Sequence, residues 1–239
     1  MAIEYKATDI PGKTAYTKDF NVQIRCITPI EQKYILSLSQ KEQRTTKDYI
    51  DFLKKLIKID NEEVKFEDLY WFDVQYLLYK IRYLTYPNYP IKLSFMCSEC
   101  GENFTQDIDI GSLQIDEPSG TKTLLLENLG ETPIRNKTVG DDLVIETFIK
   151  KNKLDVDDMQ IRLLLVDLCL ISNGRSLDEM YSLAEKGEIT ATDIIKIEQW
   201  IEKNVWGVNE TIVTKCNHCK KEASRGYSLS IEDFFSVVY

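Results

Sequence analysis

The sequence contains one histidine and ten glycines in 239 residues, and it lacks the glycine-rich loops that commonly bind phosphate groups. Neither Gly-x-Gly-x-x-Gly nor Gly-x-x-x-x-Gly-Lys-Ser/Thr is present. A Ser-His-Asp or Cys-His hydrolase could use only His218. Because His218 stands between Cys216 and Cys219, we interpret it as a solvent-facing turn residue. These absences argue against an enzyme.

Long apolar runs and an excess of basic charge are also missing. No apolar run approaches the roughly 20 residues of a membrane-spanning helix, and the first residues lack the basic-then-apolar layout of a signal peptide. A net charge of −9 and an isoelectric point of about 4.9 argue against a protein that neutralises DNA phosphates. We therefore expect a protein without membrane partners, made and used in the cytoplasm or inside an assembly built there.

Two short segments stand out among what is present, Cys97-Ser98-Glu99-Cys100 and Cys216-Asn217-His218-Cys219. Each lies between two stretches of alternating residues, which predicts a strand, a turn with two thiolates and a strand back. This pattern is typical of a zinc-ribbon knuckle, in which two sulfurs provide half of a tetrahedral site. Two knuckles predict a closed zinc site with the ligands Cys97, Cys100, Cys216 and Cys219. Such a site is structural, because no coordination position is left for water or substrate.

Three other interpretations of the cysteines stay open: a redox pair, a disulfide framework and unliganded thiols. A redox pair usually opens a helix, whose dipole lowers the thiol pKa, and neither pair here opens a helical pattern. A disulfide framework fits small secreted proteins better than a chain of this length without a signal peptide. Of the two remaining cysteines, Cys26 lies on the apolar face of a predicted strand and Cys169 lies in an apolar helix. We expect both to be core residues.

The pattern as a whole predicts an α+β fold: a pair of four-cysteine zinc-ribbon β-hairpins on a mainly helical body of about six helices, with a short N-terminal strand. The expected parts are an extended N-terminal arm at 1–18, the N-terminal strand and a helical region at 19–90, the zinc ribbon at 91–115 and 209–233, a mainly helical insertion at 116–208, and an apolar C-terminal tail at 234–239. Such a tail is seldom left in water, so we expect it to pack on the core or on a partner.

Helix starts are indicated by local capping signals. Thr28-Pro29-Ile30-Glu31 and Ser176-Leu177-Asp178-Glu179 each have the pattern of a capping box, and Thr46 is expected to cap a second helix. A helix over about 157–171 is apolar on most sides and is expected to be buried.

The helix predicted from about residue 68 to residue 85 carries more aromatic residues than one core requires. Its apolar stripe is expected to pack inside the protein. Tyr76, Tyr79 and Tyr83 lie away from the centre of that stripe. A second aromatic face of this kind favours a protein–protein contact.

Charged residues around the knuckles leave two functions to compare. The first knuckle is acidic and the second is locally basic, with Lys215, Lys220, Lys221 and Arg225. We expect the two hairpins to lie side by side with their charges offsetting. Zinc ribbons also bind nucleic acid, so a zinc-ribbon nucleic-acid-binding regulatory factor is the alternative function. The carboxylate clusters at 141–142 and 155–158 stand at predicted helix starts, where acidic side chains stabilise the helix dipole, so we do not expect catalysis there.

Several features in this order resemble the baseplate hub subunit and hub assembly proteins of T-even-type contractile-tailed bacteriophages (myoviruses). They are the N-terminal strand followed by Thr28-Pro29-Ile30-Glu31, the sequence Asp73-Val74-Gln75-Tyr76-Leu77-Leu78-Tyr79-Lys80-Ile81-Arg82, the two cysteine pairs, and Phe234-Phe235. The resemblance spans most of residues 19–239, and the cysteine pairs are its most specific element.

The resemblance implies a non-enzymatic structural or assembly protein that completes the hub of a tail baseplate by binding other hub proteins. It implies the host cytoplasm during assembly and the virion baseplate as places of action. Nucleic acid and membranes are not expected partners. The identity of the partners, the oligomeric state, and the choice between a virion subunit and an assembly chaperone stay open.

Overall fold

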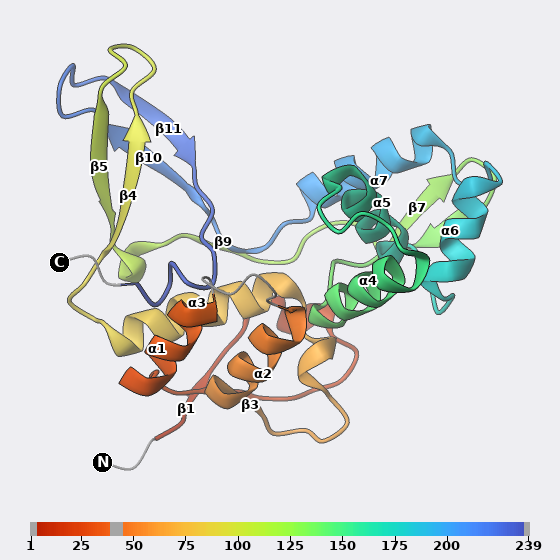
Figure 1. Cartoon of the computed structure of the whole chain (residues 1–239), viewed down its shortest axis with the longest axis horizontal. Helices are drawn as coiled ribbons and strands as arrows, with labels where there is room; N and C mark the ends of the chain where they lie inside the picture. The colour runs from red at the N-terminus through yellow and green to blue at the C-terminus, as the bar shows by residue number, and fades with distance from the viewer. Residues whose placement is uncertain (1–3, 39–44, 237–239) are drawn as a thin grey trace.

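The structure, a computed structural model, describes residues 4–38 and 45–236. It has an α+β fold, which confirms the expected class, with seven α-helices in the described ranges where about six were expected. Figure 1 shows three parts: an N-terminal body with the first three helices, a helical body with the last four, and a pair of β-hairpins that projects from the N-terminal body.

The N-terminal body combines a three-stranded antiparallel sheet, in the order β1-β2-β3, with three helices. Its elements are β1 (Lys6–Thr8), β2 (Val22–Ile24), β3 (Ile57–Ile59), α1 (Pro29–Leu38), α2 (Thr46–Leu56), α3 (Trp71–Thr85) and the 3-10 turns η1 (Pro11–Ala15) and η2 (Phe66–Asp68). The strand predicted near residue 20 is β2, the middle strand, which pairs with β1 and β3. Val22 and Ile24 on this strand point into the core on alternate positions.

The helical body lies between the two hairpins in sequence. Its elements are β7 (Thr123–Leu126), β8 (Gly130–Pro133), α4 (Val139–Asn152), α5 (Met159–Leu170), α6 (Leu177–Glu185) and α7 (Ala191–Lys203). Strands β7 and β8 form an antiparallel hairpin that contacts α7. Within residues 4–38 and 45–236, none of the helices is both long and apolar enough to cross a bilayer.

The projecting part consists of two antiparallel hairpins from distant parts of the chain. Its elements are β4 (Ile91–Met96), β5 (Asn103–Ile108), β10 (Thr211–Lys215) and β11 (Glu222–Gly226), with η3 (Ile110–Ser112) after the first hairpin. The short strand β6 (Ile115–Asp116) pairs with β9 (Gly207–Val208). Strand β6 leads the chain toward the helical body, and β9 leads it back. Because these two strands pair, the second hairpin lies beside the first (Figure 1).

Two separate apolar clusters form the core. The N-terminal body closes around the stripe of α3, whose residues Val74, Leu77 and Ile81 are fully buried. The helical body has its own cluster, which includes Cys169 at 4% exposure, so Cys169 is a core thiol as expected. Phe234 and Phe235, at 1% and 0% exposure, join the first cluster. The described part of the apolar tail thus packs on the core of its own chain.

Local capping signals predict the helix starts well, because they act within one turn. The carboxylate of Glu31 accepts a hydrogen bond from the backbone N–H of Thr28 at 2.9 Å, and Glu179 does the same for Ser176 at 2.7 Å. The second helix differs by one residue from the expectation. Its N-cap is Thr45, whose side chain accepts from the N–H of Asp48, so Thr46 is the first helical residue.

The segment before residue 19 differs from the extended arm that its polar composition predicts. Residues 6–8 pair with β2 as the edge strand β1, and η1 follows. Ile10 and Gly12 are buried. The physical reason is a buried acceptor on α3, the carboxylate of Asp73, which receives the backbone N–H of Gly12 at 2.7 Å.

Two further expectations about burial are wrong. Cys26 is exposed, because strand β2 ends at Ile24 and the alternation stops; Arg25 turns inward in its place. Helix α5 is not buried on most sides, since Met159 and Leu163 are 62% and 49% exposed. Its buried residues lie at the C-terminal half, where α4, α6 and α7 contact it.

Candidate metal centre

The register of each hairpin places a cysteine pair in its turn. In the first hairpin the last paired residues are Met96 and Asn103, so the turn consists of residues 97–102. In the second hairpin the last pair is Lys215 and Glu222, and the turn consists of residues 216–221. Because both turns have the same length and begin with a cysteine, the two thiol pairs are presented in the same way.

The backbone hydrogen bonds of the two turns match. Cys97 donates its N–H to Glu102 O at 2.9 Å, and Cys216 donates to Lys221 O at 2.9 Å. The residue after the second cysteine has positive φ in both turns: Gly101 with φ 73° donates to Cys97 O, and Lys220 with φ 64° donates to Cys216 O. The first turn uses glycine at this left-handed position, where the second turn accepts the strain of a lysine.

All four predicted sulfurs come together. The Sγ atoms of Cys97, Cys100, Cys216 and Cys219 lie within 4.8 Å of one another. The two shortest contacts between hairpins are Cys97 to Cys219 at 3.6 Å and Cys100 to Cys216 at 3.8 Å. A tetrahedral zinc ion with Zn–S bonds of about 2.3 Å separates its sulfurs by about 3.8 Å, whereas a disulfide brings them to about 2.0 Å. The thiols are free, and their spacing fits a metal rather than a disulfide.

Backbone N–H groups prepare two of the sulfurs to be thiolates. Those of Cys100 and Glu99 lower the pKa of Cys97 to about 6. Those of Cys219 and His218 lower the pKa of Cys216 in the same way, and His218 N lies 3.4 Å from its sulfur. Hydrogen bonds to the charged form favour that form, and the thiolate is the species that binds a metal.

Cys100 shows the opposite shift. The backbone N–H of Glu102 lowers its pKa, but burial and the neighbouring sulfurs together raise the pKa of Cys100 to about 12. Four sulfurs this close cannot all ionise without a cation, because like charges disfavour one another. A bound zinc ion would let all four be thiolates, and the four side chains fit that ion in number, type and spacing.

A small contact between the hairpins lies next to the sulfurs. Phe104 is buried there with Cys97 and Cys216, and Phe95 packs against them. The guanidinium carbon of Arg225, on β11, lies 5.9 Å from the ring centroid of Phe95, which places a cation of the second hairpin against the first.

One exposed ion pair joins the hairpins, between Lys221 and Glu99 at 3.5 Å. The hairpins therefore lie side by side and offset part of each other's charge, as expected (Figure 1). An exposed pair contributes under about 1 kcal/mol, so this contact alone does not hold the hairpins together.

Asp73 on α3 links the N-terminal segment to Trp206, which lies just after α7 where the chain returns from the helical body. Asp73 is fully buried and accepts hydrogen bonds from the N–H of Gly12, from Tyr16 OH at 2.7 Å and from Trp206 Nε1 at 3.2 Å. Burial outweighs these three hydrogen bonds and raises the pKa of Asp73. The sequence signal was available, since an aspartate interrupts an otherwise aromatic and apolar start of the helix.

The base of the second hairpin is fixed to the same helix. Glu210 accepts hydrogen bonds from Gln75 Nε2 at 2.7 Å and from Tyr79 OH at 2.8 Å. The ring of Tyr79 also packs edge-on against Phe234 at 4.7 Å, which leaves Tyr79 only 2% exposed. Tyr79 therefore does not face a partner protein, contrary to the expectation. Tyr83 is 45% exposed, and its role in a contact stays a prediction.

His218 and the acidic residues at the predicted helix starts have structural roles. His218 is an exposed turn residue, as interpreted. Asp141 caps α4 and accepts from Arg135 at 2.6 Å, and Asp158 is the N-cap of α5. These carboxylates stabilise helix starts.

Comparison with known proteins identifies one family. The family model described as T4 bacteriophage base plate protein matches residues 2–236. No curated protein and no solved structure matches the chain.

Proposed function

This chain belongs to the T4 bacteriophage base plate protein family, and from that membership we propose that it is a non-enzymatic structural or assembly protein of the tail baseplate hub. The family supports a structural role with other baseplate proteins as partners, and the virion tail as its location. The assignment to the hub is the finer part of the proposal. It is supported by the resemblance of the 28–31 capping box, the α3 sequence and the two cysteine pairs to hub proteins.

We further propose that zinc stabilises the scaffold, and the convergence of the four sulfurs is the observation that carries this proposal. Isolated two-stranded hairpins are marginally stable in water. The cluster at the hairpin tips contains only three buried residues, Cys97, Phe104 and Cys216. A zinc ion would cross-link the tips and hold two hairpins from distant parts of the chain as one rigid unit. It would do no chemistry there, because all four ligands come from the protein.

The hairpins also offer surface for a partner. Met96 on β4 and Val213 on β10 are 66% and 72% exposed. An apolar side chain exposed on each hairpin gives a partner apolar surface that is stabilised by burial. We propose that this unit is one of the surfaces through which the protein binds its baseplate neighbours.

The alternative, a zinc-ribbon nucleic-acid-binding factor, has less support. Two of the basic side chains that suggested it are engaged by carboxylates of the hairpins themselves. Lys215 pairs with Glu222 at 3.0 Å, and Lys221 pairs with Glu99 at 3.5 Å. A phosphate backbone would have to compete with these carboxylates in a chain of net charge −9.

Elemental analysis of the purified protein tests the zinc proposal first. We expect one zinc per chain, and we expect Cys97→Ser or Cys216→Ser to lose the metal and to become poorly soluble, because metal binding is coupled to folding. Cys26→Ser is the matched control, since Cys26 is exposed and lies outside the sulfur cluster; this variant should keep its zinc. A soluble, fully folded quadruple Cys→Ser variant would contradict the proposal.

Tail assembly in a phage that carries the gene tests the baseplate role. A phage with Cys216→Ser should make few complete tails in electron micrographs, whereas one with Cys26→Ser should assemble normally. Normal baseplates in phage that lack the gene altogether would rule out a structural or assembly role. Baseplates that form but lack only peripheral parts would keep that role and refute the assignment to the hub.

A further inference from the structure

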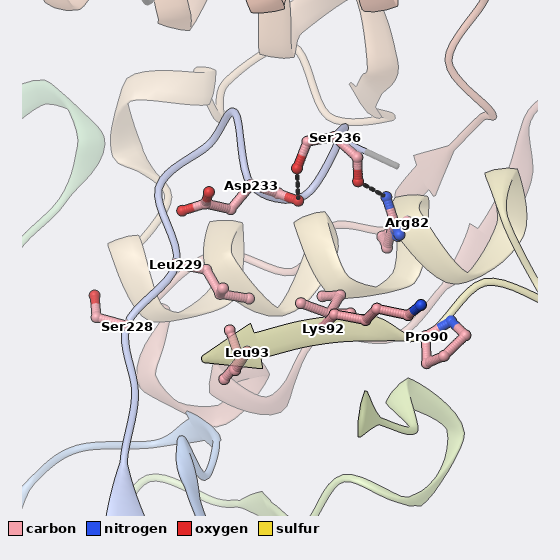
Figure 2. A pocket seen from close by; sticks show the side chains of 9 residues that line it. Arg82, Pro90, Lys92, Leu93, Ser228, Leu229, Asp233 and Ser236 are labelled. Carbon is pink, nitrogen blue, oxygen red and sulfur yellow. Dashed lines mark hydrogen bonds between the residues drawn. The ribbon is translucent and has the colours of Figure 1, made fainter. Parts of the chain in front are cut away.

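A small hollow lies where α3, the start of β4 and residues 228–236 meet (Figure 2). Its volume is about 120 Å³, and its polar lining residues are Arg82, Lys92, Ser228, Asp233 and Ser236. The three segments are far apart in sequence, and one of them begins the first hairpin. Whatever binds in the hollow contacts the N-terminal body, the hairpin and the C-terminal segment together.

Arg82 is a buried cation without a carboxylate partner. It is 1% exposed, and its Nη1 donates to the carbonyl oxygens of Phe234 at 3.0 Å and Ser236 at 2.8 Å. Its Nη2 donates to Tyr89 O at 3.3 Å, and its Nε has no hydrogen-bond partner in the part of the chain that the structure describes. Among the described residues, no carboxylate forms an ion pair with Arg82. A guanidinium has five N–H donors, so some of this donor capacity is unused. The charge is balanced by backbone carbonyl dipoles and by the ring of Tyr86, whose centroid lies 4.7 Å from the guanidinium carbon, and not by a carboxylate.

A second unpaired cation lines the same hollow. Lys92 is exposed, and no described residue forms an ion pair with it. Figure 2 shows the nitrogen atoms of Arg82 and Lys92 toward the Pro90 side of the hollow, with the carboxylate of Asp233 on the opposite side. The Asp233 carboxylate is occupied by the backbone N–H of Ser230 at 2.7 Å. One end of the hollow is therefore positive in a chain whose net charge is −9.

We propose that this hollow binds a carboxylate group, placed at the end where Arg82 and Lys92 lie. Guanidinium and ammonium groups bind carboxylates through charge-assisted hydrogen bonds. Asp233 in the lining disfavours a phosphate dianion more strongly than a singly charged carboxylate. The carboxylate is an acidic side chain of a neighbouring protein; this last step, unlike the site itself, rests on the proposed baseplate function. Docking would then brace the hairpin base against the N-terminal body.

Nuclear magnetic resonance with acetate as the probe tests the site, and acetamide is the neutral control of the same shape. The side-chain Nε–H of the buried Arg82 and the backbone amide of Lys92 report on the hollow. We expect acetate to shift both signals in a saturable way and acetamide to leave them in place. Equal shifts with both probes, or no saturation with acetate, would overturn the proposal, and so would tighter binding of inorganic phosphate than of acetate.

The variant Lys92→Met distinguishes specific binding of a carboxylate in the hollow from adventitious binding of an anion. Arg82 also holds the C-terminal segment, so its replacement risks unfolding the protein, whereas Lys92 is exposed. We expect Lys92→Met to raise the acetate concentration for half-saturation by about threefold to fivefold, as for loss of an exposed ion pair. Lys122→Met, at an exposed position in the helical body, should change nothing. Unchanged acetate binding in Lys92→Met would overturn the site.

Phage assembly then tests the source of the carboxylate. Lys92→Glu should place a repelling charge at the hollow and reduce the yield of complete tails relative to Lys122→Glu. If Lys92→Glu abolishes acetate binding but leaves tail yield unchanged, the partner side chain is refuted while the site stands. Neither result depends on zinc, so a failed proposal here is distinguishable from a failed zinc scaffold.

Discussion

A charged side chain can be buried where a counterion pairs with it, and Arg25 is the clearest case. It is 6% exposed, and its two terminal nitrogens donate to both carboxylate oxygens of Glu31, at 2.9 and 2.6 Å. Glu31 also accepts the N–H of Thr28, so one carboxylate is both helix cap and counterion. The hydrogen bonds from Arg25, foremost, and those from Thr28 lower the pKa of Glu31 to about 2.

Replacing this carboxylate should destabilise the protein in a pH-dependent way. Glu31→Gln leaves Arg25 buried without its counterion, and we expect a loss of about 3 kcal/mol in the free energy of unfolding at pH 7. Because the folded-state pKa is depressed, the wild type has this stabilisation above the ordinary pKa of 4.5 and loses it progressively as pH falls toward about 2. Urea unfolding at several pH values should show the two proteins converging over that window.

The matched control is the exposed pair between Lys18 and Glu63, at 3.4 Å. Glu63→Gln should cost under about 1 kcal/mol, because water already screens that pair. Equal losses in the two variants at pH 7 would show that burial of Arg25 does not matter.

At the scale of elements, the N-terminal segment is attached by close approach to α3. Turn η1 brings Gly12 against Asp73, and a Cβ added at Gly12 would lie 2.3 Å from Asp73 Oδ2 and 2.7 Å from Trp206 Nε1. The segment has few apolar contacts of its own, since Ile10 is its main buried apolar residue. Its docking therefore depends on this turn, on the β1–β2 pairing and on Tyr16, whose hydroxyl donates to Asp73 and whose ring packs against Tyr70.

Gly12→Ala should detach the segment rather than unfold the whole protein. The methyl group has no room unless η1 moves away from Asp73, and that movement breaks the hydrogen bond from the Gly12 N–H. We expect hydrogen exchange at residues 6–15 to accelerate by at least about tenfold, the factor that corresponds to 1.4 kcal/mol of local opening. Gly226→Ala, whose Cβ would meet only Glu210 O at 3.9 Å, should leave exchange in the segment unchanged. Unaltered exchange in Gly12→Ala would contradict the tight contact.

At the scale of the molecule, the two bodies and the hairpin pair differ in what stabilises them. The helical body has an apolar cluster of its own, centred on residues such as Leu165, Leu168 and Ile197, which are all fully buried. The hairpin tips have almost none. Metal removal should therefore affect these parts unequally.

Chelation of zinc at neutral pH is expected to open the hairpins first. Amide exchange should accelerate in β4, β5, β10 and β11, while amides of α4 to α7 keep their protection. Hydrogen exchange followed by mass spectrometry measures both in one sample, with Cys26→Ser as the variant that should behave like the wild type. Uniform loss of protection in the helical body would show that its core is not independent, and unchanged hairpin exchange would refute the zinc scaffold.

The sequence alone determined the features that act over a few residues. Cysteine spacing and alternating flanks indicated both turns, and capping boxes at residues 28–31 and 176–179 marked helix starts, because each depends on atoms within one turn of chain. Only the tertiary structure decided which distant groups meet. It brought Cys97 to Cys219, docked Gly12 on Asp73, turned Cys26 outward and buried Tyr79. Local patterns specify how a segment folds, whereas the path of the intervening chain specifies what that segment packs against.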